Sequence, residues 1–153
     1  MSKLSTMKPT LLLPLLFTLL YADDKKEDQE TPKETTVTKQ DSVTIDGQKI
    51  DYRVTASTLT LKSDDDKDRA SIFNVSYERM GQAERHKRPV VFAFNGGPGS
   101  SAVWLHLGAL GPKLVPTSPD GTKTLPPPAV LVENPYSILD IADIVFIDTV
   151  STG

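Results

Sequence analysis

A glycine-rich loop follows an apolar run in the middle of this chain and has the residue types of an anion site. The apolar run is Val90–Phe94, and the loop after it is Asn95-Gly96-Gly97-Pro98-Gly99-Ser100-Ser101. Glycine adopts backbone angles that other residues avoid, and it lets a ligand approach the main chain closely. Backbone N–H groups in such a loop, next to the start of a helix, can bind a negative charge. The next residues, Ala102–Gly108, are predicted to form that helix.

Three interpretations of the loop are open. The first is an oxyanion hole of the α/β-hydrolase type, in which a loop N–H stabilises the oxygen of a reacting carbonyl. The second is a dinucleotide-binding turn, because Gly97–Ala102 fits the pattern G-x-G-x-x-A. This turn needs an acid at a strand end about 20 residues on, where Asp120 instead lies in a turn signal. The third is a structural turn that binds nothing.

Alternating apolar and polar residues predict an antiparallel front end that would support the loop. A hairpin is predicted around Asp46-Gly47, a pair favoured in two-residue turns, and a second around the acidic tip Asp64–Asp68. The strands of these hairpins are expected at Val43–Ile45, Lys49–Ala56, Leu59–Leu61 and Ala70–Tyr77. The tip lacks the ligand spacing, central glycine and closing glutamate of a calcium loop, so it is interpreted as a solvated turn.

Two later runs predict parallel strands. Val90–Phe94 and Ile144–Ile147 are nearly continuous apolar segments, as expected of strands covered on both faces. The long segment between them provides the crossover that parallel strands require. The predicted fold is therefore α/β, with antiparallel strands followed by parallel ones.

The first 42 residues are predicted to lie outside this domain. Met1–Ala22 has lysines before a leucine-rich run and ends on a small residue, which indicates a secretory signal peptide cleaved after Ala22. The run is shorter than the about 20 residues of a spanning helix, although an uncleaved N-terminal anchor is the alternative. Asp23–Ser42 has mixed charges and few large apolar residues, so we expect a disordered linker there. The domain is then expected at 43–153.

Composition excludes several classes of function. The net charge of −3 provides no basic face for nucleic acid and no polybasic patch for a membrane surface. The chain has no cysteine, so it has neither a disulfide framework nor a thiolate metal site. We expect no metal and no cofactor.

Four blocks of sequence resemble a known family. They are similar, in letters, order and spacing, to the N-terminal third of the serine carboxypeptidases, peptidase family S10: Pro89–Gly99, Trp104–Gly108, Glu133–Ser137 and Ile141–Asp148. The resemblance extends over about Lys49 to Gly153. It departs from the family at Asp148–Gly153, where the family usually has Asp-Pro/Gln-x-Gly-x-Gly. The resemblance implies the N-terminal portion of an α/β-hydrolase fold, incomplete in this chain.

The resemblance also implies roles for the loop. The parent enzyme would release C-terminal amino acids from peptides and proteins through an acyl-enzyme. Gly97 matches the glycine whose N–H helps to hold the oxyanion, and Asn95 and Gly96 match the positions that bind the substrate's carboxylate. Pro98 and Gly99 would shape the loop. The alternative for Asn95 is a side chain that only pins the loop, and Trp104 is expected to pack the helix on the sheet. Asp148 is interpreted as a strand-end residue near the site, and Asp140 and Asp143 as surface or capping positions.

The catalytic groups of such an enzyme are missing. No G-x-S-x-G nucleophile motif occurs in the sequence, and the only histidines, His86 and His106, are interpreted as a surface and a structural residue. We expect an inactive fragment of a longer exported enzyme, periplasmic or extracellular. The absence of cysteine favours a bacterial source within the family. The alternatives are a non-catalytic exported protein that binds peptide C-termini, a decayed gene product, or an exported esterase or lipase. The oligomeric state is not predicted.

Overall fold

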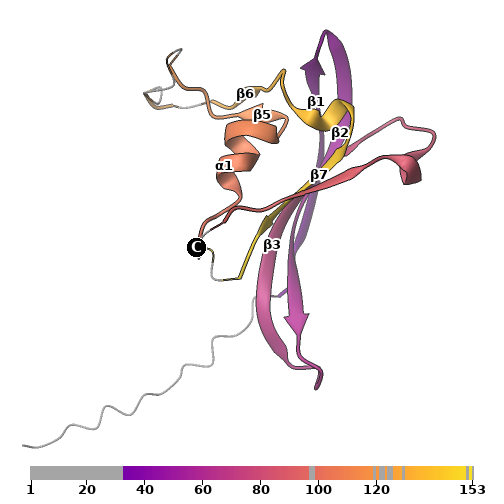
Figure 1. Ribbon diagram of the computed structural model, residues 1–153, viewed down its shortest axis with the longest axis vertical. Coiled ribbons are helices and arrows are strands. Elements are labelled where there is room, and N and C mark those ends of the chain that lie inside the picture. The colour runs from indigo at the N-terminus through magenta and orange to yellow at the C-terminus, as the bar shows by residue number, and fades with distance from the viewer. Residues whose placement is uncertain are drawn as a thin grey trace, which may run out of the picture.

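The computed structural model describes residues 33–96, 99–118, 120, 123, 126–128, 130–150 and 152. The predicted signal peptide, residues 23–32 of the predicted linker, and Gly97 and Pro98 lie outside the described residues. A long twisted sheet forms the body of the structure, and a helix and a small two-stranded ribbon lie beside it (Figure 1).

The main sheet has five strands in the order β1-β2-β3-β7-β4. Its strands are β1 (Thr36–Ile45), β2 (Gln48–Lys62), β3 (Asp68–Arg79), β7 (Asp143–Asp148) and β4 (Val90–Ala93). The pairs β1–β2, β2–β3 and β3–β7 are antiparallel, whereas β4 pairs with β7 in parallel. The predicted order of antiparallel strands followed by a parallel pair is confirmed.

The remaining elements are short. The ribbon consists of β5 (Lys113–Leu114) and β6 (Val132–Glu133), and the helical segments are η1 (Arg85–Lys87), α1 (Val103–Leu105), η2 (His106–Leu110) and η3 (Ile138–Asp140). The predicted helix after the loop is present as α1 and η2, which follow one another without a break. The second half is a π-helix, in which the N–H of Gly111 donates to His106 O at 3.1 Å.

Both predicted hairpins form. Asp46 and Gly47 have φ angles of 46° and 76°, and Ile45 pairs with Gln48 across them. This pair of left-handed residues matches the twist of the flanking strands. At the acidic tip, Asp66 N–H donates to Ser63 O, so the run of aspartates lies in an exposed turn.

The prediction of a disordered linker up to Ser42 is wrong for its last residues. Strand β1 begins at Thr36, and its register with β2 runs from Thr36 opposite Ser57 to Ile45 opposite Gln48. Side chains of residues 36–41 are exposed, so this part of β1 is held by backbone pairing with the long strand β2 and not by burial. A prediction that relies on the number of large apolar residues does not detect such a strand.

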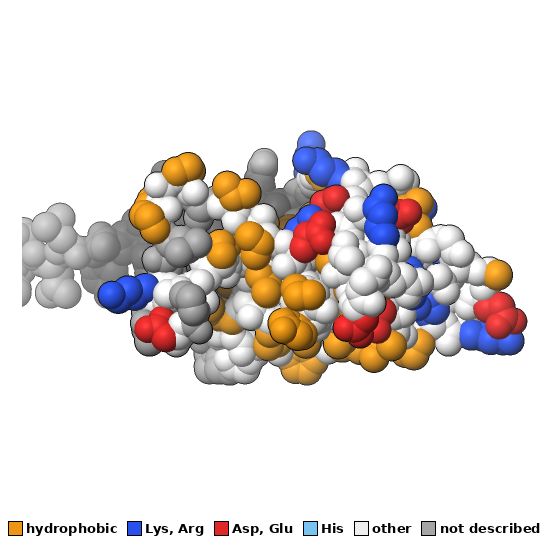
Figure 2. All heavy atoms as spheres, turned by 90° about the horizontal axis from the view of Figure 1, so that it is seen from above, with side chains coloured by type: hydrophobic (Ala, Val, Ile, Leu, Met, Phe, Trp, Pro, Cys, Tyr) orange, Lys and Arg blue, Asp and Glu red, His pale blue; other side chains and the backbone are white. Residues whose placement is uncertain are grey.

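The core lies on one face of the main sheet. Its fully buried side chains come from the hairpins, β7 and η3, and include Val43, Ile50, Tyr52, Leu139 and Ile144. Strand β4 lies at the edge of the main sheet, and its Val90 and Phe92 are 50% and 62% exposed. Apolar side chains accordingly gather on the surface seen in Figure 2.

Candidate active-site loop

The glycine-rich loop begins where two parallel strands end. Ala93 at the end of β4 pairs with Phe146 of β7, and β7 ends just beyond it at Asp148. The carboxyl ends of parallel strands meet at one edge of a sheet, which is where open α/β folds place their ligand sites. The predicted loop and the predicted strand-end aspartate are therefore neighbours.

Asn95 links the start of the loop to its end. Its Nδ2 donates to Ser100 Oγ at 2.9 Å and to Ser101 O at 3.3 Å. Its Oδ1 accepts the N–H of Gly96 at 3.0 Å. An asparagine amide has two donor hydrogens, so both are engaged within the loop. The two donors predicted to bind a substrate carboxylate, the Asn95 amide and the Gly96 N–H, are thus bonded to the loop itself.

Two of the three loop glycines, Gly96 and Gly99, lie among the described residues. Gly99 has a φ of 80°, a conformation that favours glycine. A Cβ added at Gly96 would meet no atom within 4 Å, so space is open above this residue. Gly97, the predicted oxyanion donor, and Pro98 lie outside the described residues.

Asp148 holds the exit of the loop. Its Oδ1 accepts the Ala102 N–H at 2.7 Å, and Ser101 Oγ lies 3.0 Å and 3.1 Å from its two carboxylate oxygens. Ser101 Oγ in turn accepts the Val103 N–H at 3.1 Å. Sequence reasoning placed Asp148 near the site but missed these contacts, which join positions far apart in the chain.

His106 docks the helix on the sheet. Its Nε2 lies 2.6 Å from the Tyr77 hydroxyl, and its ring stacks on Phe146 with centroids 4.6 Å apart. Burial lowers the pKa of His106, although the nearby charge of Asp148 acts in the opposite direction. Burial also raises the pKa of Tyr77 to about 12. The arrangement fits the structural role expected for His106.

Trp104 does not pack the helix on the sheet as expected. Its side chain is 72% exposed, whereas Ala102 is buried and Leu105 packs against the core. Because residues three and four apart share a helix face, the face with Ala102, Leu105 and His106 turns inward and Trp104 turns outward. Trp104 lines an apolar groove of about 440 Å³, whose other lining residues are Val103, Leu107, Gly108, Leu114, Val115 and Thr117.

The far end of the helix is held by a buried asparagine. Asn134 is fully buried, and its Nδ2 donates to the carbonyls of Ala109 and Gly111, both at 2.7 Å. Ser137 Oγ donates to Leu110 O at 2.8 Å. These bonds satisfy carbonyls at the helix end that have no partner within the helix. The block Glu133–Ser137 therefore has a structural role, because it holds the end of the helix.

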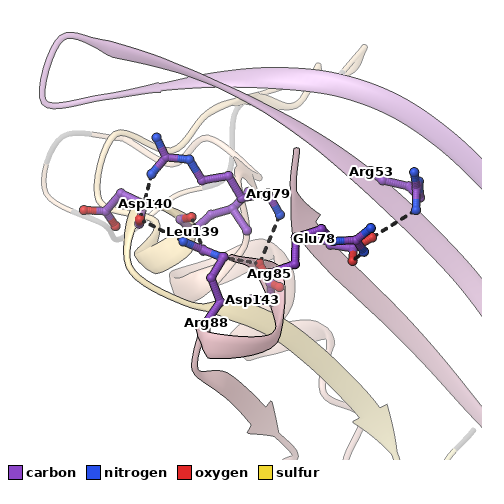
Figure 3. A network of polar contacts seen from close by, with 8 residues as sticks. All are labelled: Arg53, Glu78, Arg79, Arg85, Arg88, Leu139, Asp140 and Asp143. Carbon is purple, nitrogen blue, oxygen red and sulfur yellow. Dashed lines mark hydrogen bonds and ion pairs between the residues drawn. The ribbon is translucent and has the colours of Figure 1, made fainter. Parts of the chain in front are cut away.

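An ion-pair network holds the opposite end of β7 (Figure 3). Arg88 Nε lies 3.0 Å from Asp143 Oδ1, and these side chains are only 11% and 16% exposed. Arg79 and Arg88 also donate to the Asp140 carbonyl, at 2.8 Å and 3.4 Å. The interpretation of Asp143 as a surface or capping position is wrong, because Asp143 is a partly buried partner of Arg88. In the same view, Glu78 lies between Arg53 and Arg85.

No three histidine, cysteine, aspartate or glutamate side chains within the described residues are grouped so that they could hold a metal ion. No helix in the described part of the chain is long and apolar enough to cross a membrane.

Comparison with known proteins defines the family. Residues 57–153 match the family model of the serine carboxypeptidases, and the chain belongs to this family. No curated protein matches the chain. Among solved structures, it is similar to Kex1Δp, a prohormone-processing carboxypeptidase from Saccharomyces cerevisiae, with 28% identity and a TM-score of 0.52.

The match to Kex1Δp covers 66% of this chain and 20% of the yeast chain. The sheet described above is therefore part of an α/β-hydrolase fold. The family consists of hydrolases, the carboxypeptidases, and its members are typically secreted or vacuolar.

Proposed function

We propose that this chain forms the oxyanion and carboxylate-binding part of an exported serine carboxypeptidase, which releases C-terminal amino acids from peptides through an acyl-enzyme. The observation that supports the proposal is the position of the loop Asn95–Ser101, which leaves β4 beside the end of β7 and enters a helix. Ligands of open α/β sheets bind at this edge. Membership of the serine carboxypeptidase family supports the class of reaction, which is hydrolysis of a peptide bond.

Each loop residue has a role in the proposal. The Gly97 N–H stabilises the oxyanion of the tetrahedral intermediate, a contribution typically worth about 3–4 kcal/mol. The Asn95 amide and the Gly96 N–H bind the substrate's terminal carboxylate. Both donors are bonded within the loop, so in the proposal the carboxylate oxygens replace Ser100 Oγ and Asn95 Oδ1 as acceptors. Binding exchanges one set of hydrogen bonds for another.

The reaction needs groups that this sequence does not hold. Acyl transfer requires a nucleophile, a base that takes its proton and an acid that orients the base. The sequence has no G-x-S-x-G motif, His86 is exposed, and His106 is packed between Tyr77 and Phe146. We assign the nucleophile, base and acid to polypeptide outside this sequence, and we expect the 153-residue chain alone to hydrolyse no peptide.

The test is an assay of the complete reading frame that contains this chain. A blocked dipeptide with a free carboxylate should be hydrolysed, and its C-terminal amide should be a much poorer substrate. Gly97→Val should abolish turnover, since a side chain would crowd the reacting carbonyl. A fully active Gly97→Val enzyme would contradict the oxyanion role. Peptide binding without turnover would support a binding protein, and ester cleavage with no preference for a free carboxylate would support an esterase.

Export is part of the same proposal. The leucine-rich run that ends in the small residue Ala22 is the reason to expect cleavage after Ala22. Mass spectrometry of the mature protein from its natural host should find an N-terminus at Asp23. A cytoplasmic protein that retains Met1 would refute export.

A further inference from the structure

Strand β7 contacts both ends of the glycine-rich loop. On the entry side, β4 pairs in parallel with β7, with Ala93 opposite Phe146. On the exit side, Asp148 at the end of β7 accepts hydrogen bonds from the Ala102 N–H and the Ser101 hydroxyl, at 2.7 Å and 3.0 Å. The loop is thus held at entry and exit by one strand.

The exit contact has a charged acceptor. A carboxylate that accepts from an N–H and a hydroxyl forms charge-assisted bonds, which are shorter and stronger than neutral ones. The carboxylate of Asp148 lies with Ser101 and Ala102 at the wall of a cavity of about 250 Å³, into which His106 also faces. Two hydrogen bonds to one residue fix both the distance and the direction of the loop end.

The contact continues into the loop. Asn95 Nδ2 donates to the carbonyl of Ser101 at 3.3 Å and to Ser100 Oγ at 2.9 Å. Asp148, Ser101 and Asn95 therefore form a continuous chain of hydrogen bonds from the end of β7 to the first residue of the loop. A shift of Ser101 would move Asn95 and its bonded neighbour Gly96.

We propose that Asp148 is a positioning residue of the carboxypeptidase: through Ser101 it fixes the loop that presents the oxyanion donor and Asn95 to the substrate. This inference rests on the proposed function. Misplacing a catalytic group by about 1 Å can cost 100-fold in rate, so the loss of Asp148 should reduce catalysis without removing any group that touches substrate. A carboxylate that only capped the helix would stabilise the fold and leave turnover of the folded enzyme unchanged.

The experiment compares Asp148→Ala, Asp148→Asn and Ser101→Ala in the full-length enzyme, well below each variant's unfolding midpoint. Asp148→Ala should lower kcat on a blocked dipeptide by about 10- to 100-fold. Asp148→Asn should keep part of the activity, because its Oδ1 can still accept the Ala102 N–H. The double variant of Asp148→Ala and Ser101→Ala should be no worse than Asp148→Ala alone. Asp140→Asn is the matched control, since Asp140 makes its contacts to Arg79 and Arg88 through its backbone carbonyl.

Three outcomes overturn the inference while leaving the proposed function intact. The first is a folded Asp148→Ala enzyme with kcat and KM within twofold of the parent. The second is a double variant whose loss of kcat is the product of the losses in the two single variants. The third is a loss of kcat in Asp140→Asn equal to that in Asp148→Ala. If Asp148→Ala does not fold, Asp148→Asn and Ser101→Ala are judged by the same comparisons, each with kcat expected below that of the control.

Failure of the proposed function is distinguished by a readout that needs no turnover. If the parent enzyme hydrolyses no dipeptide, that function falls, and amide hydrogen exchange still tests whether Asp148 fixes the loop. Exchange at Gly96 and Val103, whose N–H groups donate to Asn95 Oδ1 and Ser101 Oγ, should then be at least about tenfold faster in Asp148→Ala, with the amides of β2 and β3 unchanged. Unchanged exchange at these two amides refutes the anchoring role.

Discussion

Replacing Asn95 by alanine separates the two roles that its geometry allows. The side chain makes three hydrogen bonds within the loop, two from Nδ2 and one to Oδ1. If Asn95 only pins the loop, Asn95→Ala damages hydrolysis of every substrate alike. If its amide binds the substrate's carboxylate, the damage is larger for substrates that carry one.

The size of the difference follows from hydrogen-bond energetics. A hydrogen bond to a charged group contributes about 1.5–3 kcal/mol, against about 0.5–1.5 kcal/mol for a neutral one. Since about 1.4 kcal/mol corresponds to tenfold, we expect kcat/KM on a free-acid dipeptide to fall by about 10- to 100-fold in Asn95→Ala, mainly through KM. Hydrolysis of an ester or amide of the same dipeptide should fall less.

The assay measures kcat and KM of the full-length enzyme on these paired substrates. Asn95→Asp is an informative second variant, because it keeps the size of the side chain but sets a negative charge beside the substrate's carboxylate. It should lose more activity on the free acid than on the ester. Equal losses on both substrate types, in both variants, would show that Asn95 only shapes the loop.

Three further perturbations test the fold, each by denaturant unfolding of the full-length protein. Asp143→Ala removes the ion-pair partner of the partly buried Arg88 and should lower the free energy of unfolding by about 3 kcal/mol, whereas Asp51→Ala in an exposed ion pair should change it by less than about 1 kcal/mol. Similar effects of the two substitutions would contradict the burial argument. A Cβ at Gly111 would overlap the carbonyl oxygen of His106, so Gly111→Ala should destabilise by about 1–3 kcal/mol, while Gly108→Ala, with open space around it, should be tolerated. Because burial lowers the pKa of His106, this side chain binds a proton better in the unfolded chain, and the free energy of unfolding should fall as pH drops below about 6.5. His106→Gln should show a flatter dependence of this free energy on pH, and the same dependence as in the parent would refute the role of His106 in it.

Local features of the fold could be predicted from the sequence because they depend on neighbouring residues. Asp46-Gly47 determines a two-residue turn by its own backbone preferences. The continuous apolar runs at β4 and β7 predicted a parallel pair. The start of β1 could not be found in this way, because residues 36–41 are held by pairing with β2 and bury little.

The sequence singles out the glycine-rich loop and Asp148, but it does not reveal the contacts between them. The hydrogen bonds from Asp148 to Ser101 and Ala102 depend on how β7 aligns with β4. The outward direction of Trp104 depends on which face of a short helix meets the sheet, and three helical residues give too little periodicity to decide it.

The π-helical turn of η2 has a consequence for comparing lengths among family members. In this turn the Gly111 N–H bonds to His106 O, so the turn holds one residue more than an α-helical turn between the same ends. Both ends are anchored, by Asp148 before the helix and by Asn134 after it. A relative with one residue fewer in this segment can therefore keep both anchors by forming an α-helix throughout. An alignment gap here would then mark a change of winding and not a change in the site.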